Sequence, residues 1–230
     1  MSAGIFVREL DKVKNYLIEM GDDVLKMLQD TCAVLTTLDA DKAKEIIKFD
    51  RTVNELENRV VNKAIDLIAL NQPVAGDLRF LASSLRFSTE LERIGDLSGN
   101  VSRRILDINK LILDGKDTQP LPRDLTYMIG KVLMMLETAL TSFRENDPDA
   151  AAKVMKLDDE VDDYNRNIRH KILDIVEENG KAAAWGFETI TLANHLERLA
   201  DHTTNLAEET IYMAKGYNVR HQITKDREEI

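Results

Sequence analysis

The chain contains an internal duplication, and this feature constrains its fold more than any other. Residues 89–105 align with residues 194–210 at an offset of 105, sharing Leu-Glu-Arg, Asp and Asn at the same spacing. Farther upstream, residues 41–50 align with residues 149–158 at an offset of 108. Self-similarity at a fixed period marks a repeated supersecondary unit. The sequence therefore predicts two copies of one unit.

Each copy is predicted to form three long helices. Apolar residues recur three and four positions apart, as at Leu17, Met20, Val24 and Leu28, and no segment keeps a two-residue alternation. This spacing is typical of amphipathic helices. We expect helices near residues 5–38, 41–70, 73–113, 122–145, 148–178 and 182–215. The predicted fold is all-α, with two tandem three-helix bundles over residues 1–115 and 116–230, joined by the Gly- and Pro-containing stretch near 114–122.

Prolines and one glycine are expected to mark helix ends. Proline is tolerated in the first turn of a helix and disrupts its interior, so Pro73, Pro122 and Pro148 indicate helix starts. Asp147 is a suitable N-cap before Pro148. Gly180 follows Asn179 and is expected to end a helix in the left-handed conformation.

Composition and charge exclude several classes of protein. Lys and Arg number 31 against 41 Asp and Glu, a net charge of −10, so the chain offers no overall attraction to nucleic acid. Its longest apolar runs, such as residues 65–70, fall far short of the roughly 20 residues that span a bilayer. The N-terminus shows no basic segment followed by an apolar one, and the single cysteine, Cys32, forms no internal disulfide. We expect a cytoplasmic protein.

Carboxylates recur at helical spacing in both copies. Glu92 with Asp96, and Glu197 with Asp201, lie four residues apart and therefore on one helix face. The same faces and those of the preceding helices give ten candidate metal ligands: Asp50, Asn54, Glu92, Asp96, Asn100, Asp158, Asp162, Glu197, Asp201 and Asn205. Facing stripes of carboxylate and amide oxygens suit hard cations such as Mg²⁺, Ca²⁺, Mn²⁺ or iron. The alternative is a pair of solvated acidic stripes, neutralised by nearby arginines such as Arg103 or Arg104.

No catalytic constellation accompanies these carboxylates. Di-iron oxidases on helical bundles use Glu-x-x-His, and none of the four histidines has a glutamate three positions before it. A phosphate-binding GxxxxGK[ST] loop and a GxSxG nucleophile motif are also absent. Both His195 and His202 lie near the second acidic pair, either as packing residues or as additional ligands. The expected role is binding rather than catalysis.

Five segments of the chain resemble the PhoU family of phosphate-signalling regulators. These are LERIGDLSGN and LERLADHTTN, with QPVAGDLR at 72–79, DDEVDD at 158–163 and KGYNVRH at 215–221. The resemblance implies two three-helix bundles whose repeated acidic motifs bind multinuclear metal clusters. The implied ligands are Asp50, Glu92 and Asp96 in the first half, with Asp158, Asp162, Glu197 and Asp201 in the second. Asn54 departs from the acidic pattern, so we expect the first cluster to hold less charge or to bind more weakly.

The resemblance also implies a function. A member of this family is expected to bind iron, zinc, manganese or magnesium and to restrain the phosphate-starvation response. Its expected partners are the ATPase of a phosphate ABC transporter and a sensor histidine kinase, with peripheral membrane association through them and a homodimeric state. One alternative is a metal-storage or metal-buffering bundle without a signalling role. A second is a helical adaptor whose carboxylates bind no metal.

Overall fold

The computed structural model describes residues 3–217, and six long helices make up most of them. Their bounds are α1 (Ala3–Thr37), α2 (Ala40–Asn71), α3 (Ala75–Leu113), α4 (Arg123–Glu145), α5 (Pro148–Glu178) and α6 (Ala183–Lys215), with a 3₁₀ turn η1 (Gly180–Ala182) before the last. No strand occurs within residues 3–217. The all-α prediction is confirmed, and each predicted helix matches an observed one to within a few residues.

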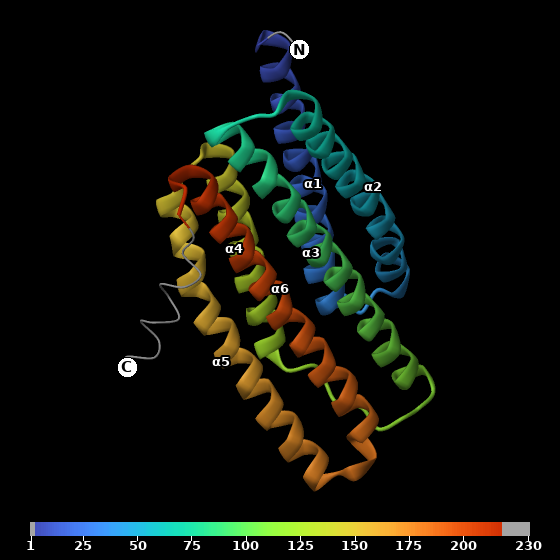
Figure 1. The fold of residues 1–230 in the computed structure, drawn as a ribbon. Coiled ribbons are helices and arrows are strands. Elements are labelled where there is room, and N and C mark those ends of the chain that lie inside the picture. Colours follow the sequence, from blue (N-terminus) through green and yellow to red (C-terminus); the bar gives the residue numbers. More distant parts are fainter. Residues whose placement is uncertain (1–2, 218–230) are drawn as a thin grey trace.

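The helices form two antiparallel three-helix bundles that lie side by side (Figure 1). The first bundle packs α1, α2 and α3 together, and the second packs α4, α5 and α6. The bundles join chiefly through α3 and α6, with a smaller contact between α1 and α4. Figure 1 shows α2 and α5 on opposite outer edges, with α3 and α6 adjacent at the centre. The two helices that carry the repeated Leu-Glu-Arg motifs are therefore neighbours across the interface.

Small residues let the central helices pack on two sides. Helix α3 buries Ser84, Ser88, Gly95 and Ser98 among its larger apolar residues, and α6 buries Ala193, Ala200 and Thr203. A Cβ atom at Gly95 would lie 3.3 Å from Cγ1 of Val53, so α2 and α3 approach closely at this level. The buried hydroxyls of Ser98 and Thr203 donate hydrogen bonds to carbonyls one turn earlier in their own helices, which satisfies them without a partner helix.

The observed helix ends confirm two of the predictions made from the sequence and differ from two others. Asp147 caps α5, its carboxylate accepting from the backbone N–H groups of Asp149 and Ala150, and Pro148 begins the helix as predicted. Pro73, by contrast, precedes α3, which starts only at Ala75. Gly180 was expected to adopt a left-handed conformation, but it begins the η1 turn, and the Asn179 side chain accepts from the Lys181 N–H there.

The apolar core runs through both bundles. The predicted apolar stripe of α1, including Leu17, Met20, Val24 and Leu28, is fully buried, as is Trp185 at the start of α6. Cys32 lies partly buried against this core. Among residues 3–217, no helix is both long and apolar enough to cross a membrane. Each helix directs apolar residues into the core, and the central helices α3 and α6 do so on two sides.

Candidate metal centres

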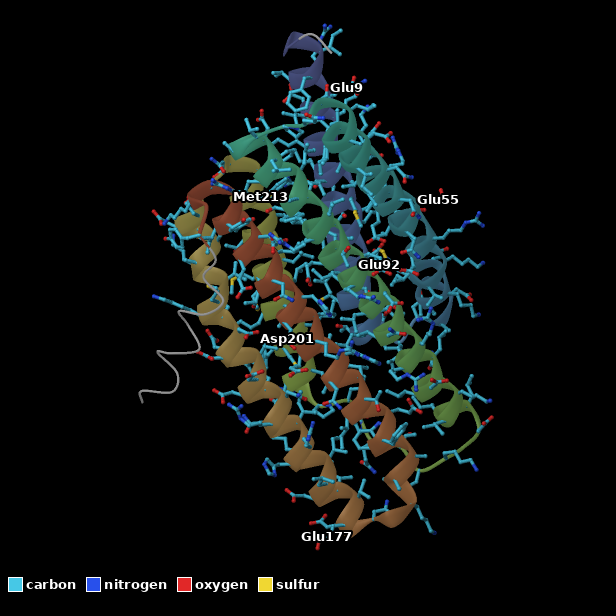
Figure 2. The ribbon with its side chains drawn as sticks, in the orientation of Figure 1. Glu9, Glu55, Glu92, Glu177, Asp201 and Met213 are labelled. Carbon is cyan, nitrogen blue, oxygen red and sulfur yellow. The ribbon has the colours of Figure 1, made fainter. Side chains whose placement is uncertain are left out.

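The first candidate centre lies between α2 and α3, near the middle of the first bundle. Asp50 and Asn54 project from α2, while Glu92 and Asp96 project from α3, and all four side chains are partly buried. Figure 2 shows Glu92 at mid-height of the molecule, well inside the exposed Glu55 on the outer helix. Asp50 interacts electrostatically with both Asp96 and Glu92. The structure thus brings together the first four predicted ligands.

The second candidate centre lies between α5 and α6 at the equivalent place in the other bundle. Asp162 of α5 interacts electrostatically with both Glu197 and Asp201 of α6. Asp158 lies one helical turn before Asp162 and is partly buried. Figure 2 shows Asp201 on α6, lower in the view than Glu92 on α3. The duplication therefore positions two acidic clusters on either side of the central α3–α6 interface.

Burial and mutual repulsion both perturb the carboxylates. Partial burial, followed by the charge of Asp96, raises the pKa of Asp50, and Arg103 opposes the shift. Loss of hydration also raises the pKa values of Glu92, Glu197 and Asp201, with neighbouring carboxylates adding to the effect. Each shift reflects a free-energy cost of holding these groups ionised together. A bound cation would offset that cost, because its positive charge would stabilise the ionised carboxylates.

Buried oxygen atoms without hydrogen-bond partners test whether a cation fits. Three such atoms lie at the clusters: Oδ1 of Asp50 and Oδ1 of Asn54 in the first, and Oδ1 of Asn165 beside the second; Thr204 Oγ1 and Glu209 Oε2 on α6 are others. Buried polar atoms normally have a partner, so these exceptions require an explanation. Hard cations bind carboxylate and amide oxygens, and both clusters supply that donor set. Within residues 3–217, no three acidic, histidine or cysteine side chains already converge as they would around an ion, so binding requires these side chains to rotate.

The sequence reasoning missed Glu57 as a member of the first cluster. Glu57 lies on α2, interacts electrostatically with Glu92, and accepts a hydrogen bond from the Thr89 hydroxyl at 3.0 Å. At the offset of 108 it aligns with Asn165, whereas Asn54 aligns with Asp162. Between the two copies of the repeat, the acid and the amide therefore occupy each other's positions on the helix. Each cluster region contains four carboxylates, which removes the charge argument for weaker binding at the first.

The two asparagines that follow the acidic pairs make other contacts. The Asn100 amide donates to Oδ2 of Asp96 at 3.3 Å, while its carbonyl oxygen accepts from Arg103 at 2.6 Å. The Asn205 amide donates to Oε2 of Glu90 on α3 at 3.1 Å. In the described conformation both side chains take part in polar contacts around the clusters. Whether they also ligate a metal stays a prediction.

Polar contacts tie the two bundles together beside the clusters. His202 Nδ1 lies 2.7 Å from Oε2 of Glu90 across the α3–α6 interface. Arg104 donates to Glu188 of α6 at 2.7 Å and also pairs with Asp107. Arg104 therefore bridges the bundles instead of neutralising the first acidic pair, while Arg103 lies near Asp50. The sequence carried no signal for these pairings because they join residues from different copies.

Comparison with known proteins identifies two matching segments. Residues 17–105 and 125–210 each match the PhoU domain. The chain is 32% identical to the phosphate-specific transport system accessory protein PhoU homolog 1 of Thermotoga maritima, over 94% of this chain and 91% of that protein. It is 30% identical to the corresponding homolog of Pseudomonas aeruginosa, over 98% of this chain and 92% of that protein.

Solved structures give the same result. The crystal structure of PhoU from Pseudomonas aeruginosa is similar with a TM-score of 0.85 and 29% identity, covering 92% of this chain and all of that chain. The regulatory protein PhoU from Streptococcus pneumoniae follows with a TM-score of 0.84 and 25% identity, covering 93% and 99%. Fold and site together define a duplicated three-helix-bundle protein with an acidic cluster in each copy. The chain belongs to the PhoU family.

Proposed function

We propose that the chain is a cytoplasmic, metal-binding regulator of phosphate uptake and of phosphate-starvation signalling. The observation that carries the metal-binding part is the set of buried, unpartnered oxygens at Asp50, Asn54 and Asn165 in the two clusters. The regulatory part is supported by the names of its relatives, which are phosphate-specific transport system accessory proteins. The protein acts by binding, without catalysing a reaction itself.

Each metal centre would link an outer helix to a central one. In the first, Asp50, Glu57, Glu92 and Asp96 supply carboxylates, with Asn54 as an amide donor. In the second, the donors are Asp158, Asp162, Glu197 and Asp201. Iron, zinc, manganese and magnesium are the candidate ions, since all accept oxygen ligands. A bound ion supplies positive charge that neutralises carboxylates which otherwise repel one another.

The proposed partners are the ATPase of a phosphate ABC transporter and a sensor histidine kinase. When phosphate is abundant, the protein holds the kinase in its phosphatase-favouring state and thereby represses the starvation response. Long helices with polar outer faces, such as α2 and α5, offer extended surfaces on which partner helices can dock. The proposed state is a homodimer that reaches the membrane only through its partners.

Metal analysis of the purified, untagged chain tests the first part. Elemental analysis after gel filtration is expected to find bound metal in the unaltered protein. The pair Glu197→Gln with Asp201→Asn is expected to lose the share held by the second cluster. Glu55→Gln is the matched control, because Glu55 is 65% exposed on the outer helix and pairs with Arg51 one turn away. Equal metal content in all three proteins would refute the ligand assignment.

A starvation reporter tests the regulatory part. A cell lacking the gene is expected to express the phosphate-starvation response even with abundant phosphate, and the unaltered chain is expected to repress it. The pair Glu197→Gln with Asp201→Asn is expected to repress poorly, whereas Glu55→Gln represses normally. Full repression by a variant that has lost its metal would separate signalling from metal binding. A reporter that never responds to the gene would favour the metal-storage alternative.

A further inference from the structure

A pocket with a cationic rim opens beside the second acidic cluster. Its volume is about 380 Å³, and it is lined by Asp162, Asn165, Arg166, Arg169, His170 and Glu197. Two of these residues, Asp162 and Glu197, belong to the candidate metal centre. Three others, Arg166, Arg169 and His170, come from α5. At about 30 Å³ for each water molecule, the pocket has room for roughly a dozen, enough for a hydrated ion and a small anion.

The arginine at the rim of this pocket is available to an anion. The Arg169 guanidinium donates to the neutral Asn194 side chain at 3.1 Å, and within residues 3–217 it forms no ion pair. Arg166, in contrast, pairs with Asp163 on its own helix. Arginine presents several donors in a planar fork, a geometry that matches oxyanions such as phosphate. Arg169 also lowers the pKa of the Glu197 carboxyl. Its guanidinium therefore acts on a cluster carboxylate and also has the donor geometry that an oxyanion needs.

The first cluster lacks this rim, although the two bundles are copies of each other. At the offset of 108, Arg166, Arg169 and His170 align with Asn58, Val61 and Asn62, none of which is charged. The first cluster instead has Arg103 near Asp50, where its charge stabilises that carboxylate. Each cluster thus has an arginine that acts on one of its carboxylates, and Arg169 also lines an open pocket. The duplication has produced two acidic clusters with different surroundings.

We infer that the second cluster, when it holds its metal ion, binds inorganic phosphate in this pocket, with Arg169 donating to the phosphate oxygens. The inference rests on the proposed metal binding, because without a cation Asp162 and Glu197 would repel a phosphate anion. A bound Mg²⁺-like ion keeps coordination positions that water or phosphate oxygens can fill. We name phosphate rather than another oxyanion because the relatives of the chain are named for phosphate transport.

The test measures phosphate binding to the full chain loaded with Mn²⁺. Equilibrium dialysis with radiolabelled phosphate gives the affinity, and broadening of the phosphate ³¹P NMR signal reports whether it lies beside the paramagnetic ion. Arg169→Gln is expected to raise the dissociation constant at least tenfold while leaving bound Mn²⁺ unchanged. Arg51→Gln is the matched control, since Arg51 is 87% exposed on α2 and pairs with Glu55. We expect that control to change the affinity less than twofold.

The outcomes separate the inference from the function on which it rests. Phosphate that binds only to the Mn²⁺-loaded protein, and weakly to Arg169→Gln, supports the inference. A chain that retains Mn²⁺ but binds no phosphate at millimolar concentration, or binds it equally well after Arg169→Gln, overturns the inference and leaves metal binding intact. A chain that retains no Mn²⁺, iron or zinc overturns both. Binding of phosphate to the metal-free chain would also contradict the electrostatic argument.

Discussion

Replacing Glu197 by glutamine is predicted to change the stability of the protein in opposite directions with and without metal. Glu197 is partly buried and faces like charges from Asp201 on its own helix and Asp162 on α5. Without metal, Glu197→Gln removes these repulsions, so the variant is expected to be more stable than the unaltered chain. With metal, the same change removes a ligand, so the stabilisation that the ion provides is lost.

The expected magnitudes follow from the two neighbours of Glu197. A like-charge pair four residues apart on a helix, such as Glu197 with Asp201, costs about 0.2–0.5 kcal/mol. With a similar cost for the contact to Asp162 on α5, relieving both contributes about 0.4–1 kcal/mol. For a chain of 230 residues, unfolding midpoints move by about 2–4 °C per kcal/mol, which gives a rise of about 1–4 °C without metal. A site saturated at 100 times its dissociation constant stabilises by about 2.7 kcal/mol. Losing it lowers the metal-bound midpoint by about 5–11 °C.

Thermal unfolding by circular dichroism, with chelator and with saturating Mn²⁺, measures both effects. The control Glu55→Gln changes one exposed carboxylate outside the clusters and is expected to shift neither midpoint by more than about 1 °C. The reasoning is refuted if Glu197→Gln lowers the midpoint in chelator. It is equally refuted if the variant keeps the full stabilisation by metal, since Glu197 would then bind no ion.

Three further predictions concern the metal-free fold. Burial and neighbouring charges raise the folded-state pKa of carboxyl groups such as Asp50 and Glu197. At pH values just above the ordinary carboxyl pKa of about 4, the native state therefore binds more protons than the unfolded state. The unfolding free energy in urea is therefore expected to rise as the pH is lowered from about 7 toward about 5, and saturating metal removes that slope. Trp185→Ala is expected to cost about 3–5 kcal/mol, measured by urea unfolding, because the indole is fully buried. Gly216→Ala is expected to cost at least about 1–2 kcal/mol by the same measurement, since its φ of +78° is left-handed and the added Cβ would also displace the Arg79 guanidinium.

Each of these predictions has its own contrary result. Stability of the metal-free protein that stays level or falls between pH 7 and pH 5 would show that the clusters are not strained by charge. A loss below about 1 kcal/mol for Trp185→Ala would contradict the burial of its ring. For the glycine, Gly180→Ala is the matched control, because Gly180 has ordinary backbone angles and open space around it. Equal effects at both glycines would remove the conformational argument.

Local patterns in the sequence were sufficient for most of the fold. The 3.6-residue spacing of apolar side chains predicted all six helices because helix formation depends on residues a few positions apart. The Asp147–Pro148 cap was predictable for the same reason. The end of α5 before Gly180 was also predictable, but the conformation of Gly180 was not. The conformation of a glycine between two helices depends on where the next helix must begin, and here Asn179 caps a 3₁₀ turn.

Candidate site residues were predictable where the repeat supplied a second copy for comparison. Glu92 and Asp96 match Glu197 and Asp201 position for position, so a shared role could be inferred before any contact was known. Glu57 was missed because its counterpart, Asn165, is an amide. The exchange of acid and amide becomes meaningful only when α2 and α3 are seen to face each other, which places Glu57 near Glu92.

The sequence by itself determined the helices, the duplication and the repeated carboxylates, because these depend on spacing along one chain. Only the tertiary structure decided how the copies meet, through α3 and α6, and that Glu90 contacts His202 and Arg104 contacts Glu188 across that interface. It also decided that a pocket with Arg169 on its rim opens beside the second cluster. The physical reason is that charge and burial act through space, between side chains that lie far apart in the sequence.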